Sequence, residues 1–320
     1  FELEVAPDFH VLRYLVVRWQ PNMSDELVLL DAQCAFILGQ HQLALKTIQK
    51  LKSGSSDVEL QANVLTYQVY IAQKKYGVVL DEIPEDAKEP ELKLLRLLAT
   101  YLSKGVSEDA VVKQLDRILE QHMDLSQSAI VIAATIYLHL NMVEYALKTL
   151  NNGSDTYCNA LTVQCLLHMN RCDLAGKAVR RMQTADEDSL AAQLAAALYY
   201  VKKGGDQLQE SIHIYEELRE KHGPSTLLLN GQAAALMGMN NWVEAEPVLQ
   251  EAIDLDGNNP DTIVNMIVVY HHLGKPAETI NRLISQLRDC CKDHPFLVDY
   301  AEKEDEFTRC AKHYAPSVPG

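Results

Sequence analysis

The side chains of this sequence most suited to chemistry are its seven cysteines and eleven histidines. Cys158, Cys165 and Cys172 recur every seven residues, and thiolates in a regular series are potential zinc ligands. On one helix, however, a seven-residue step spans about 10.5 Å along the axis. That separation is too large for two thiolates that must each lie about 2.3 Å from the same zinc ion. We therefore expect buried free thiols here.

Two adjacent pairs, His271–His272 and Cys290–Cys291, are the other candidates for a reactive or ligating site. Neighbouring residues on a helix point in different directions, so neither pair can converge on one ligand. We expect one of the two histidines to face solvent. The cysteine number is odd and the spacing irregular, which is typical of reduced thiols in a cytosolic protein.

No motif of an enzyme family is present. The sequence contains no GxxxxGK[ST], GxGxxG, GxSxG or HExxH pattern. We therefore expect a non-catalytic protein with no cofactor and no metal. The alternative from another class is a helical hydrolase, which would need acidic or histidine side chains converging in one pocket.

The charge balance restricts the partners. The net charge is −15 and the isoelectric point is near 5.1, which disfavours binding to nucleic-acid phosphates or anionic lipids. The basic doublets Arg180–Arg181 and Lys202–Lys203 are typical of solvated helix ends. No apolar run reaches 18 residues, so we expect no transmembrane helix. We predict no nucleic-acid partner and only peripheral contact with membranes.

The sequence contains two consecutive copies of one helical hairpin pattern, and the rest of the chain is interpreted from this repeat. The first copy occupies Thr226–Asn259 and the second begins at Pro260, a period of 34 residues. Small residues, Ala233 and Ala245, stand where the two helices of the first copy must touch. This pattern resembles the tetratricopeptide repeat, whose hairpins stack into a right-handed superhelix. A lone hairpin cannot cover its apolar stripe, so each copy requires neighbours.

The fold class predicted is therefore all-α, a right-handed α-α superhelix, or solenoid, of tetratricopeptide-like hairpins. We expect eight hairpins, the sixth with a turn lengthened at Gly204–Gln207 so that Ser211 can take the place of a small residue. Residues 1–22 lack the pattern and form an atypical N-terminal extension, disordered or an artefact of gene prediction. Residues 23–293 form the repeat domain, and residues 294–320 form a C-terminal capping helix and a tail.

The inner groove of such a solenoid is lined by the first helix of each hairpin, at positions i, i+4 and i+7. This face is mostly apolar and has no lysine or arginine, so it fits an apolar protein segment better than an acidic peptide tail. The alternative is that the same residues are core in a tightly closed superhelix. The predicted partner-binding groove comprises Val131, Leu138, Leu167, Tyr200, Asn230, Met237, Val264, Val268 and His271.

Several longer runs carry a closer resemblance. They are YIAQKKYGVVLDEI (Tyr70–Ile83), IYLHLN (Ile136–Asn141), STLLLNGQAA (Ser225–Ala234), HLGKPAETINRLISQL (His272–Leu287) and HPF (His294–Phe296). In this order they are similar to runs of the epsilon subunits of the coatomer complex, and the similarity extends from about Asp25 to Pro316.

The resemblance implies a structural subunit of the COPI vesicle coat. It implies binding to the C-terminal region of the coatomer alpha subunit and, through it, to the rest of coatomer. It also implies a role in Golgi-to-ER retrograde and intra-Golgi protein transport, and a cytoplasmic location with peripheral attachment to Golgi membranes and COPI-coated vesicles. The alternative is a tetratricopeptide-repeat scaffold of another multiprotein complex, such as a ubiquitin-ligase or ciliary-transport assembly.

Overall fold

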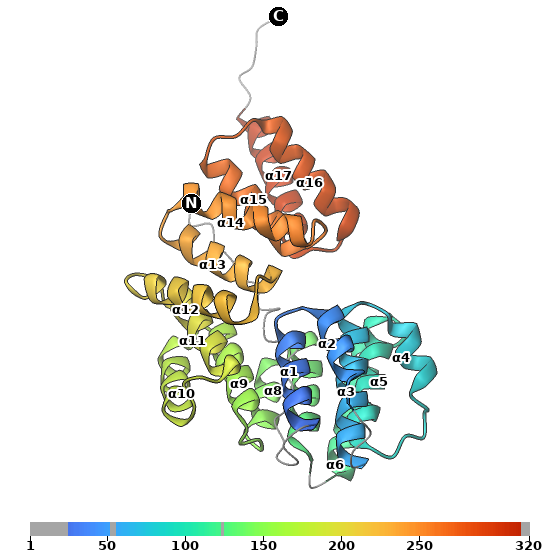
Figure 1. The fold of residues 1–320 in the computed structure, drawn as a ribbon. Helices are drawn as coiled ribbons and strands as arrows, with labels where there is room; N and C mark the ends of the chain where they lie inside the picture. The colour runs from blue at the N-terminus through green and yellow to red at the C-terminus, as the bar shows by residue number, and fades with distance from the viewer. Residues whose placement is uncertain (1–24, 52–55, 123–124, 315–320) are drawn as a thin grey trace, which may run out of the picture.

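The computed structural model describes residues 25–51, 56–122 and 125–314, and the predicted extension at residues 1–22 lies outside these ranges. The described residues form α-helices and no strand (Figure 1). The helices are α1 (Asp25–Ile37), α2 (His41–Ile48), α3 (Ser56–Ala72), α4 (Tyr76–Glu82), α5 (Pro90–Leu102), α6 (Glu108–Gln121), α7 (Gln127–His139), α8 (Val143–Leu150), α9 (Thr156–His168), α10 (Cys172–Ala185), α11 (Leu190–Lys203), α12 (Gln207–His222), α13 (Thr226–Gly238), α14 (Trp242–Leu255), α15 (Pro260–His272), α16 (Ala277–Cys290) and α17 (Pro295–His313).

These helices pair into the eight predicted hairpins, α1/α2 to α15/α16, and each hairpin turns at a residue with positive φ. Seven turns share one hydrogen bond, in which the N–H after the left-handed residue donates to a carbonyl five residues back, as Lys75 does to Tyr70. This is the Schellman closure of a helix C-terminus. The left-handed residues are Gly39, Lys74, Lys104, Asn141, Asn170, Gly204, Gly205, Asn240 and Gly274.

The sixth hairpin departs from this closure, but the prediction of a lengthened turn was wrong, because three residues separate α11 from α12 just as three separate α13 from α14. Its turn contains two successive left-handed glycines, Gly204 and Gly205. The chain then enters α12, where Ser211 is fully buried and its hydroxyl donates to the Ala197 carbonyl at 3.0 Å. A small polar residue thus takes the place that alanine occupies in the neighbouring hairpin, and the additional residues lie in α11 and α12 and not in the turn between them.

Small residues allow the two helices of a hairpin to approach closely. Ala233 on α13 and Ala245 on α14 are both fully buried, as are Leu249 and Ala252 beside them. In the described residues, every extensive helix–helix contact joins elements that are adjacent or next but one along the chain. The molecule is therefore a nearest-neighbour stack, as expected for a solenoid.

Polar caps fix where several first helices begin. The Ser126 hydroxyl accepts from the Ala129 N–H at 3.1 Å at the start of α7, and Ser225 caps α13 by accepting from the Leu228 N–H. Ser107 lies at the N-cap of α6, but its side chain makes no capping hydrogen bond. At that helix the acidic residues of the first turn supply the favourable charge instead.

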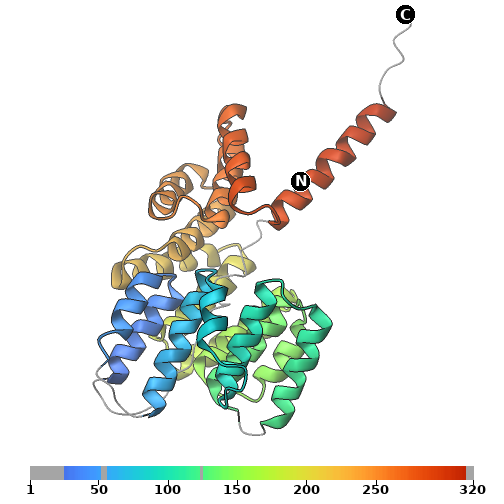
Figure 2. The ribbon, with the colours of Figure 1, turned by 90° about the vertical axis from the view of Figure 1, so that its right-hand side faces the viewer.

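The predicted last helix is α17, and it covers the end of the stack with its first turn only. Leu297 is buried and Phe296 is half-buried against the preceding helices. The helix then projects away from the other elements (Figure 2), and residues 298–314 are exposed. Most of α17 is therefore a free arm on the solenoid.

Candidate functional site

The predicted groove crosses the first helices of successive hairpins, α7, α9, α11, α13 and α15. Four of its members are buried in the chain itself: Val131 (1% exposed), Leu138 (8%), Leu167 (0%) and Met237 (2%). The first three belong to one continuous core cluster that also contains residues of α3 and α5. These four side chains are not available to a partner unless the solenoid changes shape.

The other five groove residues lie toward the C-terminal hairpins and remain accessible. Tyr200, Asn230, Val264 and Val268 are half-buried, and His271 is exposed. The accessible part of the predicted groove therefore extends from α11 across α13 to α15. It combines aromatic, aliphatic and amide side chains.

An amide ladder joins α13 to α15 within this accessible part. The Asn230 Nδ2 donates to the Thr226 carbonyl and to the Thr262 hydroxyl, both at 2.8 Å. The Asn265 Nδ2 in turn donates to the Asn230 Oδ1 at 3.0 Å. The sequence-based groove omitted Asn265, although its spacing from Asn230 is close to the repeat period and could have revealed it. Held in this way, the amides are ordered before any ligand arrives.

The adjacent histidines do not form a shared site. Both are exposed, whereas the sequence predicts that one of them faces solvent. The His272 ring lies parallel to the Trp242 ring, with centroids 3.7 Å apart and an interplanar angle of 2°. The His272 ring therefore packs α15 against α14. His271 remains a member of the predicted groove.

The cysteine series is split between two helices. Cys158 and Cys165 are buried on α9, and Cys172 begins α10. Burial raises the pKa of both buried thiols to about 12, so neither is a nucleophile near neutral pH. Among the residues that the structure describes, no group of three or more His, Cys, Asp or Glu side chains is arranged to hold a metal ion.

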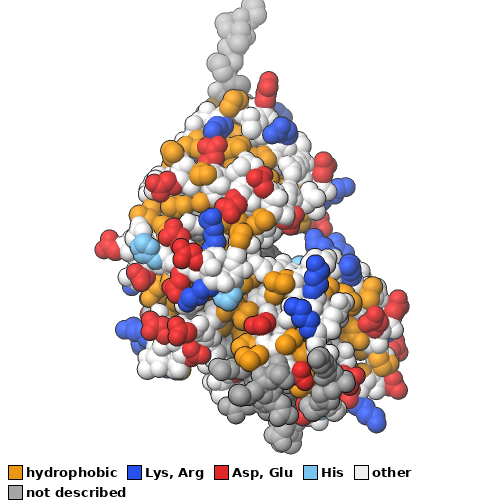
Figure 3. All heavy atoms as spheres, in the orientation of Figure 1, with side chains coloured by type: hydrophobic (Ala, Val, Ile, Leu, Met, Phe, Trp, Pro, Cys, Tyr) orange, Lys and Arg blue, Asp and Glu red, His pale blue; other side chains and the backbone are white. Residues whose placement is uncertain are grey.

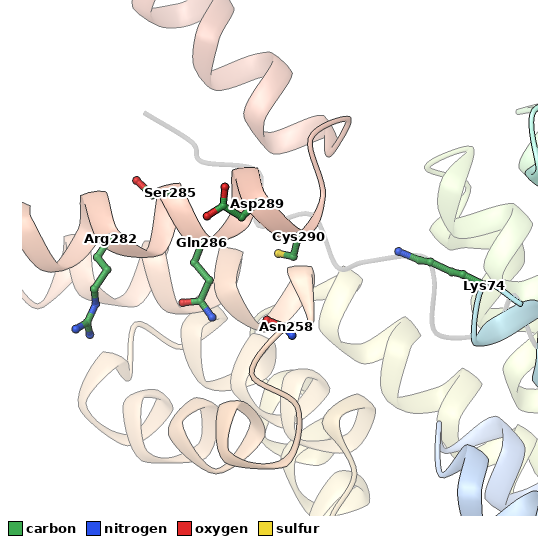
Figure 4. Close-up of a pocket in the computed structure, with 7 residues that line it drawn as sticks. All are labelled: Lys74, Asn258, Arg282, Ser285, Gln286, Asp289 and Cys290. Carbon is green, nitrogen blue, oxygen red and sulfur yellow. The ribbon is translucent and has the colours of Figure 1, made fainter.

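A polar cavity of about 710 Å³ lies between the two halves of the molecule (Figure 4). Lys74 reaches it from the α3–α4 turn and points toward Cys290, the last residue of α16. Burial raises the pKa of Cys290, and the charge of Lys74 acts in the opposite direction. No sequence pattern could signal this cavity, because its walls are far apart along the chain. Its lining residues are Lys74, Asn258, Arg282, Ser285, Gln286, Asp289 and Cys290.

The described helices include none that is both long enough and apolar enough to cross a lipid bilayer. The activity that this arrangement suits best is the binding of another polypeptide. The accessible groove supplies apolar contact and ordered amides, which suit a protein segment.

Comparison with known proteins gives a consistent result. A family model described as coatomer epsilon subunit matches residues 23–315. The coatomer subunit epsilon-1 of Arabidopsis thaliana is 34% identical over 282 residues, covering 88% of this chain and 94% of the relative. The coatomer subunit epsilon of Dictyostelium discoideum is 33% identical over 293 residues, covering 89% and 97%.

Among solved structures, the APC/C hetero-tetramer Cut9–Hcn1 superposes with a TM-score of 0.60 at 11% identity. The match covers 88% of this chain and 55% of that chain. At this level of identity the similarity concerns the helical-repeat fold alone.

Proposed function

Because this chain belongs to the coatomer epsilon subunit family, we propose that it is a non-catalytic structural subunit of the COPI coat that binds the C-terminal region of the alpha subunit. Through the alpha subunit it joins the rest of coatomer and supports Golgi-to-ER retrograde and intra-Golgi transport. It acts in the cytoplasm and attaches to Golgi membranes and COPI-coated vesicles peripherally, through the coat.

The accessible groove is the observation that carries this proposal. Tyr200, Val264 and Val268 offer apolar surface, and none of the groove residues is a lysine or arginine. An acidic chain with such a face is suited to an apolar, neutral or basic polypeptide and not to an acidic tail. We propose that an extended or hairpin segment of the alpha subunit occupies this groove.

The amide ladder supports the same mode of binding. Asn230 and Asn265 lie among the apolar groove residues and are held in place by hydrogen bonds. Ordered amides can exchange hydrogen bonds with the main chain of an extended segment without losing side-chain entropy on binding. The groove would therefore recognise both the apolar side chains and the backbone of its partner.

Size-exclusion chromatography of the purified chain with recombinant alpha-subunit fragments tests the proposal. We expect co-elution with the C-terminal region and none with an N-terminal fragment of similar length. Co-elution with neither fragment, by a chain whose circular dichroism is helical, would refute the assignment of the alpha subunit as partner.

A further inference from the structure

Three turns of the N-terminal hairpins meet three loops of the C-terminal hairpins in order along the chain. The α1–α2 turn meets the α12–α13 loop, where the Gln40 Nε2 donates to the His222 carbonyl at 3.2 Å. The α3–α4 turn meets the α14–α15 loop at the cavity lined by Lys74 and Asn258. The α5–α6 turn meets the α16–α17 loop, where the Lys104 Nζ lies 3.3 Å from the Asp293 Oδ2. We call this line of contact the seam.

The regular order has a simple geometric cause. Each turn meets a loop that lies five to six hairpins later, so one edge of the solenoid returns to face the other after a fixed number of hairpins. In Figure 1 the edge formed by α1–α4 faces α13–α16, and Figure 3 shows a hollow between these two halves. The seam is thus a contact between successive gyres of the superhelix.

The contacts across the seam are weak. The Lys104 and Asp293 side chains are 85% and 87% exposed, and the hydrogen bond of Gln40 is also exposed. In the described chain no extensive helix–helix contact crosses the seam. Exposed ion pairs contribute little to stability and are screened by salt. Opening the seam would therefore leave the packing within and between neighbouring hairpins intact.

Charges are distributed unequally across the seam. Lys74 and Lys104 project from the N-terminal turns, and Asp293 faces Lys104 from the loop after α16, whereas the Asp289 carboxylate points away from Lys74 (Figure 4). Lys and Arg side chains gather on the lower side of the hollow in Figure 3. Arg282 also lines the cavity, but it points away from Lys74 in Figure 4. The Lys104–Asp293 ion pair is an attractive contact across the seam.

We propose that the seam is a gate, at which the two halves of the solenoid separate and rejoin, and that attraction between Lys104 and Asp293 sets the closed fraction. The motion needs only small rotations at successive hairpin interfaces, because each hairpin packs extensively only against its neighbours. The gate does not depend on the proposed function.

A partner-free distance measurement tests the gate. Spin labels placed at Gln114 on α6 and Asn281 on α16, both exposed, report the separation of the two halves. Labelling through a non-canonical amino acid leaves the native cysteines in place. Double electron–electron resonance at about 50 mM and about 1 M NaCl should show a short distance at low salt and a growing longer population at high salt.

Charge variants establish whether the ion pair controls the gate. Asp293→Lys should raise the ratio of open to closed molecules about twofold to fivefold at low salt, the range expected for one exposed pair. The swap Lys104→Asp with Asp293→Lys should restore the wild-type ratio. Asp173→Lys is the matched control, because it reverses an exposed carboxylate whose ion pair with Arg171 lies within one hairpin. It should leave the ratio unchanged.

Two outcomes would overturn the inference. One narrow distance distribution in every variant and at both salt concentrations would mean that the seam does not open. A broad distribution that ignores salt and charge would mean that this ion pair does not control it. Neither outcome affects binding of the alpha-subunit region, so failure of the gate is distinguishable from failure of the proposed function.

Discussion

The ring of Tyr215 on α12 lies directly against Gly231 on α13, so that a β-carbon at Gly231 would overlap the Tyr215 Cζ. Tyr215 is 2% exposed, so its ring is enclosed by the surrounding core. The sixth and seventh hairpins therefore approach through a glycine, and a tyrosine fills the space that its missing side chain leaves.

Gly231→Ala should destabilise the protein even though alanine is the better helix former. Alanine gains about 1 kcal/mol of helix propensity, but overpacking against the Tyr215 ring costs about 1–3 kcal/mol. We expect a lower melting temperature, restored in part by adding Tyr215→Leu. Gly77→Ala on α4 is the matched control, because nothing lies within 4 Å of its new β-carbon and φ there is not positive. A Gly231→Ala protein as stable as wild type would contradict this packing.

The register of the seventh hairpin can be tested at Ala245, which is fully buried. Ala245→Phe should lower the free energy of unfolding by about 1–3 kcal/mol because a phenyl ring cannot fit between α13 and α14. Val243→Phe, at a position on the same helix that is 72% exposed, should have little effect. Denaturant unfolding measures both. Equal stability of the two variants would mean that Ala245 does not face α13.

Because most of α17 projects from the solenoid, we expect substitutions on its exposed part to leave the stability of the protein unchanged. Phe307 is 74% exposed, so Phe307→Glu should leave the melting temperature within error of wild type. Leu297→Ala, at the one buried residue of this helix, should lower it, since a buried leucine typically costs about 2–5 kcal/mol when truncated. If Phe307→Glu destabilised the isolated chain, α17 would be packed against the solenoid in solution.

Thiol reactivity should separate the cysteines by burial. The pKa of Cys158 and Cys165 is raised to about 12 by burial, so at pH 8 both remain neutral thiols and should resist alkylation in the folded protein. The exposed Cys310 should react at once. The raised pKa also means that the stability from these neutral thiols is complete below about pH 9 and is lost as the pH rises toward 12. Mass spectrometry after timed alkylation checks the order; rapid modification of Cys165 without unfolding would contradict it.

The hairpins were predictable because their signals are local. The period between Thr226 and Pro260, the small Ala233 and Ala245 and the glycines at the sixth turn specify where helices pair, and the structure has those pairs. The local sequence pattern does not determine the curvature of the superhelix. Curvature accumulates from small rotations at each interface, so the meeting of Lys104 with Asp293 has no counterpart in the sequence.

The same limit applies to the groove. The spacing of Val131 and Leu138 on their helix identifies one face, but whether that face is open depends on the curl of the whole stack. Both are buried here, whereas Val264 and Tyr200, selected by the same rule, are partly accessible. The projection of α17 away from the solenoid could not be predicted from the sequence for a similar reason. Its sequence predicts a helix, but only the tertiary structure shows that Phe307 is exposed.

Binding of a groove variant to the C-terminal region of the alpha subunit tests the central claim most directly. Tyr200→Glu together with Val264→Glu introduces two charges into the accessible groove, and a matched double variant, Val243→Glu with Leu255→Glu, places them at exposed positions of α14. Isothermal titration calorimetry should show a dissociation constant about 10- to 100-fold higher for the groove variant and unchanged for the control. Undiminished affinity in a groove variant that keeps its helical circular dichroism would contradict the account.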